Sequence, residues 1–588
     1  MKLLFLEAFL KPVFSTFHKR VLSHIIILLT LPILTSCSSD KTFEEFTHSL
    51  FLDEITSNTI NLHYSLENPR EYGIKRYPIS LGDFSKDSRT AAVANLEETL
   101  SILNTYPYLG LTTEEKLTYD ILEDYLTTQL SLHAYDLYQE PLSASGGIHM
   151  ELPILFAEYE FKDEQDVKDY LKLIALTDEY YKGVIDFEKE KSQAGLFMSD
   201  TQCQKVIESC ISFLEETSSH YLASTFENRI STLSLSEKKR NFYIEENHRI
   251  LNEHVFPAYE TLISGLSSLM GSGTNDFGLC YFPSGKEYYE LLVYAETGCP
   301  DSIDDIFTQI DLKRTEDLLT CVELQENRPA ILQECRFLEW DEMEPTSMLT
   351  SLQDEILGDF PKPPEAKCKI CYVEPSLEEY LAPAFYIVAP MDNYLENTIY
   401  INNSYVTRDL YSFTTLAHEG YPGHLYQTVM SYEYDMLPVR SILNYSGYTE
   451  GWATYIEMMS YHYANLTEDV ASMFSHNQSA TLSLYASSDI GLHYYGWTPT
   501  DMYAFWSSYG IYDKDVIDEI TQLILSEPGN YLKYYVGYLE FLDLQAAVST
   551  SLGSDFSLVD FHRTILDIGP APFSILEKYF WTYYSPQT

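Results

Sequence analysis

Apolar residues recur every three to four positions over most of the chain, a pattern that predicts a protein built mainly of amphipathic helices. The clearest helical patterns cover residues 42–66, 91–103, 114–134, 163–190, 201–217 and 445–459, with a longer one inside 235–270. Thr112 and Glu115 have the spacing of a capping box at the start of the third of these helices.

Two short runs, residues 384–388 and 398–401, are instead rich in β-branched and aromatic residues. An Asp-Asn turn region between them predicts a β-hairpin. A strand in this position could hold an extended peptide by backbone pairing, next to the histidine-rich stretch that follows. We therefore expect a small β element beside the candidate site.

Composition limits the function more than the fold. The chain has 588 residues, of which 45% are hydrophobic and 14% aromatic, so it is long and apolar enough to fold around a large core. Its formal net charge of −51 argues against nucleic-acid binding, because neutralising phosphates requires clustered Lys and Arg.

The N-terminus has the order of a secretory signal. Basic residues lie within positions 1–20, an apolar run covers residues 25–33, and Leu-Thr-Ser precedes Cys37. This ending resembles the lipobox of bacterial lipoproteins, which implies cleavage before Cys37, lipidation there and a membrane anchor outside the cytoplasm. The alternative is a plain signal peptide, or an uncleaved anchor, with an incidental cysteine.

We divide the chain into a signal peptide (1–36), a tether (37–45), an N-terminal helical scaffold (46–270) and a catalytic region (271–588). The last two are expected to form one continuous body. Export permits disulfides among the remaining eight cysteines, but the sequence leaves their connectivity open. Cys368 and Cys371 form a single CxxC pair, and the lack of a second pair disfavours structural zinc.

The stretch HEGYPGH carries the strongest chemical signal. Imidazole and carboxylate are usual zinc ligands, and a glutamate beside a ligating histidine can serve as a base. His418 and His424 are six residues apart, which on a continuous helix is about 240° around the axis. Because Pro422 interrupts helical hydrogen bonding and Gly423 adds freedom, we predict a break that lets His424 swing back toward His418.

A third ligand is expected on the helix predicted over residues 445–459. Glu450 lies among large apolar and small residues, and a carboxylate is costly to bury there without a cation or metal. Glu457 could ligate instead, or it could contact a ligating histidine and orient its ring without touching the metal. It could also be a plain surface carboxylate of the helix.

HEGYPGHLYQ and YTEGWATYIE together resemble the bacterial family of domain-of-unknown-function 885, which is grouped with the gluzincin metallopeptidases. Further matching stretches cover residues 147–161, 284–292, 489–497 and 527–537. The resemblance implies a two-lobed, mainly helical gluzincin-like fold. It also implies one Zn²⁺ per chain held by His418, His424 and Glu450, with Glu419 as the base.

The expected chemistry is hydrolysis of a peptide bond by a zinc-activated water. Such a reaction needs a donor for the developing oxyanion, and His493 and Tyr534 are candidates, although packing roles suit either residue nearly as well. Arg440 could bind a substrate carboxylate, or it could simply pair with one of the many acids.

The sequence therefore predicts an extracytoplasmic zinc peptidase that acts on short peptides and is anchored to the membrane through its N-terminal lipid. Two alternatives stay open. One is a metal-dependent amidase or hydrolase acting on cell-wall peptides, and the other is a surface lipoprotein that binds without catalysis.

Overall fold

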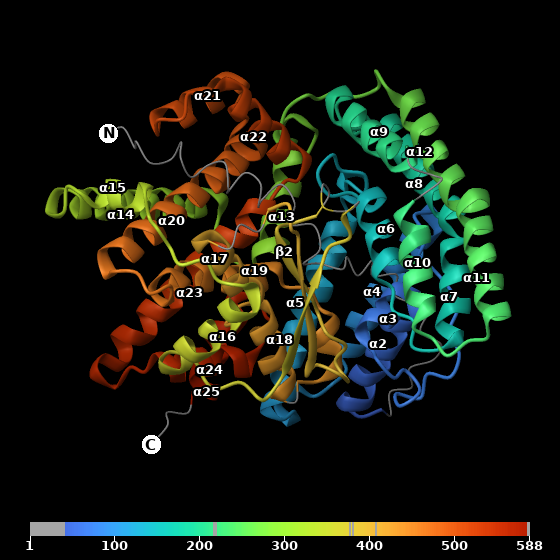
Figure 1. Cartoon of the computed structure of the whole chain (residues 1–588), viewed down its shortest axis with the longest axis horizontal. Helices are drawn as coiled ribbons and strands as arrows, with labels where there is room; N and C mark the ends of the chain where they lie inside the picture. The colour runs from blue at the N-terminus through green and yellow to red at the C-terminus, as the bar shows by residue number, and fades with distance from the viewer. Residues whose placement is uncertain are drawn as a thin grey trace.

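The computed structural model describes residues 41–215, 220–375, 378, 381–405, 409–434 and 436–584. The predicted signal peptide, Cys37 and the first part of the predicted tether lie outside these residues. Within them, helices dominate and the strands form one small sheet (Figure 1). The mainly helical fold class is confirmed.

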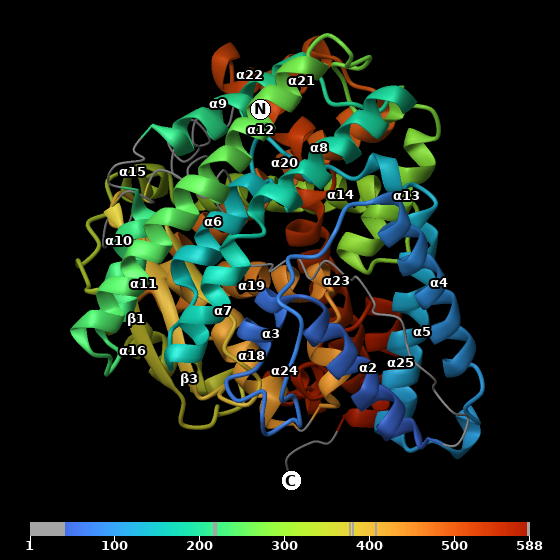
Figure 2. The ribbon, with the colours of Figure 1, turned by 90° about the vertical axis from the view of Figure 1, so that its right-hand side faces the viewer.

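Two separate hydrophobic cores divide the molecule into two lobes. The smaller lobe lies on the right of Figure 1 and comes forward in Figure 2. Its helices are α6 (Ile148–Glu158), α7 (Glu164–Ile174), α8 (Thr177–Ala194), α9 (Asp200–Leu214), α10 (Tyr221–Ser231), α11 (Glu237–Ile250) and α12 (Phe256–Leu269).

The larger lobe combines the C-terminal half of the chain with three N-terminal helices. Its main helices are α2 (Phe43–Ser57), α4 (Lys86–Leu103), α5 (Thr113–His133), α13 (Gly285–Thr297), α14 (Ile303–Asn327), α17 (Leu410–Glu419), α18 (His424–Glu433), α19 (Ser446–Ser460), α20 (Glu468–Ile490), α22 (Lys514–Ser526), α23 (Asn530–Leu552), α24 (Leu558–Ile568) and α25 (Phe573–Tyr583).

The division between the two cores does not follow the order of the chain. α2, α4 and α5 contribute Phe46, Leu96 and Leu122 to the larger core. α2 contacts the 3₁₀ turn η7 (Pro438–Ile442), and α5 contacts α13 and α25, all of which come from the later part of the chain. α4 packs on α5. The smaller lobe is therefore an insertion into the larger one.

Local polar groups set the ends of the helices. The helix predicted over residues 42–66 is broken at Asn58, whose side chain accepts from the Ile60 and Asn61 N–H groups and so starts α3 (Thr59–Ser65). The capping box at the start of α5 is confirmed, with both of its hydrogen bonds present.

The sheet has the order β1-β3-β2 and lies between the lobes (Figure 1). β2 (Ala384–Ile387) and β3 (Glu396–Ile401) pair antiparallel, which confirms the predicted hairpin. β1 (Lys367–Tyr372), which contains the CxxC pair, joins β3 in parallel and was not predicted. Side chains alternate across β2, so that Tyr386 enters the larger core and Phe385 the smaller.

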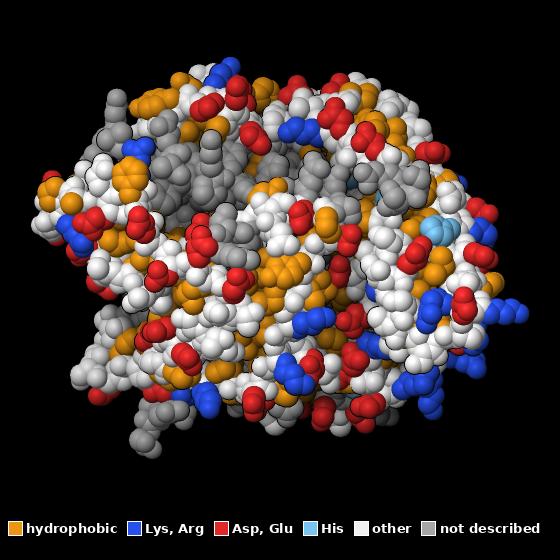
Figure 3. Space-filling model, in the orientation of Figure 1, with side chains coloured by type: hydrophobic (Ala, Val, Ile, Leu, Met, Phe, Trp, Pro, Cys, Tyr) orange, Lys and Arg blue, Asp and Glu red, His pale blue; other side chains and the backbone are white. Residues whose placement is uncertain are grey.

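Acidic side chains are spread over both lobes on the face shown in Figure 3 and do not gather in one patch. The eight cysteines of the described residues are all free, so no disulfide joins any two of them. None of the described helices combines the length and the apolar character that crossing a membrane would require.

Candidate metal centre

The predicted break between the two histidines is present. α17 ends at Glu419 and α18 begins at His424, with a cis peptide between Tyr421 and Pro422 in the intervening turn. The Gly423 N–H donates to the Ala417 carbonyl at 3.0 Å, which turns the chain back over the end of α17. The two imidazole rings consequently lie 4.8 Å apart between centroids.

Gly423 is required by the close approach of two backbone segments. A Cβ atom at this position would lie 1.8 Å from the His418 carbonyl oxygen and 2.4 Å from that of Ala417. Both obstacles are main-chain atoms, so no side-chain rotation relieves the clash. The glycine thus permits the turn that brings His424 next to His418.

α19 holds this turn from the other side. The indole Nε1–H of Trp452 donates to the Pro422 carbonyl at 2.9 Å, and the ring is fully buried. α19 in turn lies against α23 so closely that a Cβ at Gly451 would be 2.4 Å from the Gly537 backbone. These contacts fix Glu450, which precedes Gly451, relative to the two histidines.

The structure brings His418, His424 and Glu450 together. One carboxylate oxygen, Oε2 of Glu450, lies 3.5 Å from Nε2 of each histidine. The side chains of His418 and Glu450 are each 1% exposed and that of His424 is 11% exposed. Two imidazole nitrogens and a carboxylate oxygen at a buried point are the donor types that zinc prefers.

Two carboxylates compete for the place of third ligand. Ligand atoms of His418, Glu419 and His424 all lie within 4.8 Å of one another, a spacing that suits a metal ion. Glu419, however, accepts the main-chain N–H of Tyr386 through Oε2 at 3.0 Å. We favour Glu450 as the ligand because a single one of its oxygens faces both histidines, which leaves Glu419 beside the centre.

Glu457 lies behind His418. Its Oε2 is 3.3 Å from the Nδ1 of that ring, on the side away from Glu450, and its Oε1 accepts from the Gln478 amide at 3.2 Å. Glu457 and Gln478 are both buried. A carboxylate on the second ring nitrogen fixes the tautomer and orientation of a metal-binding histidine.

The free edge of β2 faces the centre. The Asn402 N–H donates to the Pro383 carbonyl, which places the hydrogen-bonded pairs of the hairpin at 383/402 and 385/400. The N–H and C=O of Tyr386 therefore point away from β3, and this N–H is the group that reaches Glu419. The predicted proximity of the strand to the site is confirmed.

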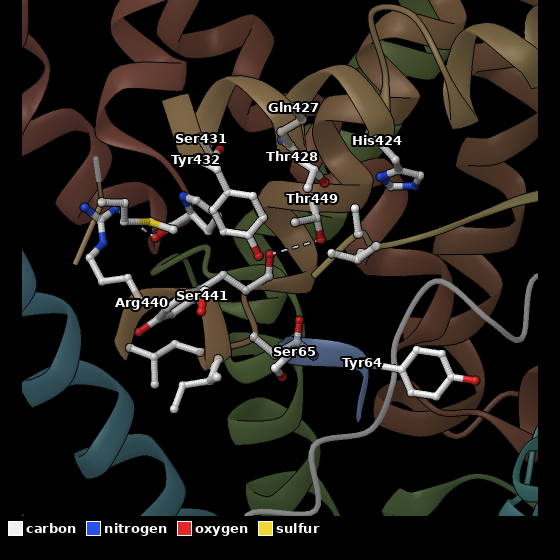
Figure 4. A pocket seen from close by; sticks show the side chains of 18 of the residues that line it. Tyr64, Ser65, His424, Gln427, Thr428, Ser431, Tyr432, Arg440, Ser441 and Thr449 are labelled. Carbon is white, nitrogen blue, oxygen red and sulfur yellow. Dashed lines mark hydrogen bonds between the residues drawn. The ribbon is translucent and has the colours of Figure 1, made fainter. Parts of the chain in front are cut away.

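A cavity of about 210 Å³ adjoins His424 (Figure 4). Roughly 10–15 Å³ is enough for one water molecule, so this cavity has room for part of a substrate. Its walls come from α3, α6, β2, α18, η7 and α19, which bring both lobes to one site.

Arg440 lines the same cavity and is 2% exposed. Its Nη1 donates to Glu114 Oε1 at 3.1 Å, and its Nη2 donates to the carbonyls of Ile568 and Pro570. The arginine therefore reaches the candidate site, while its terminal nitrogens are used within the protein.

His493 does not belong to the centre, which corrects the expectation that it stabilises an oxyanion. Its Nδ1 accepts from the Leu279 N–H at 3.2 Å, and its Nε2–H donates to the Ile524 carbonyl at 3.0 Å. Burial lowers the pKa of the ring to about 4, so it is neutral. With both nitrogens occupied by main-chain groups, His493 joins three segments of the fold.

Tyr534 is buried on α23, the helix that lies against α19. Its role stays a prediction. Sequence reasoning missed Trp452 and Gln478, which support the centre, and Glu114, which pairs with Arg440. The position of Trp452 within the motif EGWAT could have indicated its role. Nothing in the sequence indicated Gln478 or Glu114, because their contacts join distant parts of the chain.

The fold and the site define a two-lobed helical protein with a buried His-His-Glu cluster. Over residues 70–579 the chain matches the family described as "Bacterial protein of unknown function (DUF885)", and it belongs to that family. The resemblance drawn from the sequence motifs is confirmed. A search of curated proteins finds no match.

Two solved structures share the fold. "The putative lipoprotein from Colwellia psychrerythraea" is 19% identical with a TM-score of 0.77, over 92% of this chain and 99% of that one. "A putative lipoprotein of unknown function from Shewanella oneidensis" is 16% identical with a TM-score of 0.63, over 92% and 100%. "A putative oligoendopeptidase F from Bacillus anthracis str. Ames", at a TM-score of 0.27, is too distant to bear on the fold.

Proposed function

We propose that this protein is a zinc-dependent peptidase that hydrolyses short peptides outside the cytoplasm. The observation that carries the proposal is the convergence of His418, His424 and Glu450 in a buried site with Glu419 beside it. Three protein ligands and one open position are typical of catalytic zinc, whereas structural zinc usually has four protein ligands.

One zinc ion held by these residues would supply a Lewis acid and lower the pKa of a water molecule to about 7. With that metal bound, Glu419 would act as the base that accepts a proton from water and returns it to the leaving amine. The Tyr386 N–H holds Oε2 of Glu419 at 3.0 Å, so the carboxylate is already oriented before a substrate binds. Glu457 keeps the His418 ring in the orientation needed for ligation.

The free edge of β2 supports a peptide substrate. Residues 387–389 line the cavity, directly after the segment whose main-chain groups point away from β3. An extended peptide could pair with this edge and place a carbonyl near the centre. Tyr534 is retained as the proposed donor to the oxyanion. Arg440 is retained as a proposed substrate-side residue because it lines the same cavity as His424.

The proposed location is the outer side of a bacterial membrane, with Cys37 as the lipid anchor. The order of residues at the N-terminus supports an anchor, and the two structures that share the fold are described as lipoproteins. The expected partners are short peptides and the membrane. Nucleic acid is not expected, given the net charge of −51.

The test is the variant Glu419→Gln, assayed for metal content and for hydrolysis of a mixed peptide library. We expect the variant to keep one zinc per chain and to lose about 100- to 10,000-fold in rate, the usual contribution of a general base. Glu433→Gln, the same change at the surface end of α18, should leave both readouts unchanged.

If the wild-type protein bound zinc and hydrolysed no peptide, the proposal would be wrong and a binding lipoprotein would be favoured. Hydrolysis confined to cell-wall peptides would instead favour the amidase. Full activity in the Glu419→Gln variant would remove Glu419 from the mechanism.

A further inference from the structure

The cavity beside His424 has an unusual charge for this protein. The chain contains 88 acidic and 37 basic residues, yet none of the described residues that line the cavity is an aspartate or glutamate. Within this described lining, Arg440 is the one residue with a permanent charge. The lining of the cavity therefore differs from the acidic composition of the chain as a whole and favours an anionic group.

Several buried polar groups that line the cavity lack a hydrogen-bond partner among the described residues. They are Asn61 Nδ2, Gln427 Nε2, Ser431 Oγ and Arg440 Nε. Each of these four residues is at most 6% exposed. Burying a polar group without a partner is costly, so native proteins usually keep such a group for a ligand or an ordered water.

The chemistry of these groups selects the ligand. Three of the four atoms are nitrogen donors and the fourth is a hydroxyl that can donate. Donors of this kind are satisfied by acceptor oxygens, and a carboxylate carries only acceptors. Rotation of the Asn61 and Gln427 amides exchanges their oxygen and nitrogen atoms, whereas the Arg440 Nε–H and the Ser431 hydroxyl can donate in any assignment.

The donors are distributed from the centre to the far end of the cavity. In Figure 4, His424 and Arg440 lie at opposite ends, with Gln427, Thr428 and Ser431 of α18 between them. Positions 424, 427, 428 and 431 share one face of that helix by their spacing. The remaining walls are largely apolar and include Leu155, Ile442 and Leu443.

We propose that this cavity binds the carboxyl-terminal residue of a short peptide, with its α-carboxylate at the Arg440 end and its side chain against the apolar walls. The inference rests on the proposed peptidase and makes it a carboxypeptidase-type enzyme, which cuts near the free end of its substrate. Glu114 does not fill this role, because it meets Arg440 from outside the cavity and its side chain is 36% exposed.

Binding to the zinc-loaded Glu419→Gln protein tests the inference without relying on hydrolysis. Calorimetry would compare three peptides of one sequence: the free acid, the C-terminal amide, and the amide with a glutamate side chain at the last position. We expect the free acid to bind about 10- to 100-fold more tightly than either amide, the value of a charged hydrogen bond. Equal affinities, or preference for the glutamate side chain, would overturn the proposal.

Matched variants in the same background locate the effect. Gln427→Glu replaces a donor by an anion of the same shape and should weaken binding of the free acid about tenfold or more, with little change for the amide. Gln333→Glu, an exposed position on α15 (Ile331–Arg336), controls for net charge. Glu114→Gln leaves Arg440 without its anionic partner and should strengthen binding of the free acid.

The two proposals fail in different ways. Wild-type hydrolysis with no preference for a free C-terminus would leave the peptidase intact and remove the carboxylate site. Tight binding of the free acid by a protein that hydrolyses no peptide would support the carboxylate site and overturn the proposed peptidase. An acid-to-amide ratio that is unchanged in folded Gln427→Glu and Glu114→Gln proteins would also overturn the assignment of the site.

Discussion

Among the regions of the larger lobe that bury histidine side chains, the candidate metal centre and the surroundings of His493 offer different kinds of partner. At the candidate metal centre the partners are carboxylates, with Glu450 Oε2 at 3.5 Å from both rings and Glu457 Oε2 at 3.3 Å from His418. At His493 the partners are the N–H of Leu279 and the carbonyl of Ile524. His418 and His493 are each 1% exposed, so burial does not distinguish the two regions.

The partners decide what each ring can do. Main-chain partners use one donor and one acceptor and so hold a neutral imidazole, which leaves no nitrogen for a ligand. Two carboxylates around one ring are costly to bury unless a cation completes the site. Both regions carry stretches that resemble the same family, so sequence similarity alone assigned chemistry to each, and the contacts separate them.

The largest effect is expected from Glu450→Gln. The substitution removes the anionic oxygen shared by the two histidines, so we expect loss of stoichiometric zinc after dialysis and loss of any zinc-dependent rise in the thermal midpoint. Elemental analysis and thermal unfolding measure the two readouts. The control variant His493→Gln should keep its zinc. Loss of zinc from His493→Gln and retention by Glu450→Gln would contradict the assignment of metal binding to the Glu450 region.

Gly423→Ala should disturb the centre through the backbone. The new Cβ would meet main-chain oxygens at 1.8 and 2.4 Å, and we expect destabilisation of about 3 kcal/mol together with weaker zinc binding. Gly358→Ala is the control, because nothing lies within 4 Å of that Cβ. Equal thermal midpoints for the two variants would show that the turn accommodates a Cβ atom at position 423, which would contradict this prediction.

His493 should make the stability of the folded protein depend on pH, independently of the metal centre. Its folded pKa of about 4 lies below the ordinary value of 6.5, so the unfolded chain binds a proton that the folded protein excludes. Stability from this residue is complete above pH 6.5 and falls by about 3 kcal/mol as the pH drops through 4.

The variant His493→Gln lacks this titration. The difference in thermal midpoint between wild type and variant should therefore shrink as the pH is lowered from 7 to 4. A difference that stayed constant over this range would contradict the neutral, main-chain-bound assignment of the ring.

The smallest effect is expected from Glu457→Gln. The glutamine can still accept from Nδ1 of His418, so orientation is partly kept while the negative charge is lost. We expect zinc affinity to fall about tenfold, the lower end of the usual range for such partners, with full occupancy at saturating metal. Competition with a chromophoric chelator measures the change, and an unaltered affinity would show that Glu457 has no role at the centre.

The parts of the site that the sequence predicted are those encoded within short stretches. Pro422 and Gly423 forced the helix to end between the histidines, and the aromatic runs before them formed the expected hairpin. The break at Asn58 was missed because a polar side chain capped a new helix inside a continuous apolar pattern.

What the sequence left open depends on contacts between distant residues. Arg440 and Glu114 are 326 residues apart, and nothing near either one reveals the pair. The occupied nitrogens of His493 and the parallel addition of β1 likewise depend on segments brought together only by the fold.

The insertion of the smaller lobe into the larger has a consequence for synthesis. α2, α4 and α5 leave the ribosome before η7, α13 and α25, the later elements that contact α2 and α5. The inserted lobe has its own core and can condense earlier, so the order of core formation runs against the order of the chain. A chain cut near residue 270 would lack Val373, Leu381 and Phe385 of the smaller core, and it would leave uncovered the faces of α2 and α5 that contact η7, α13 and α25.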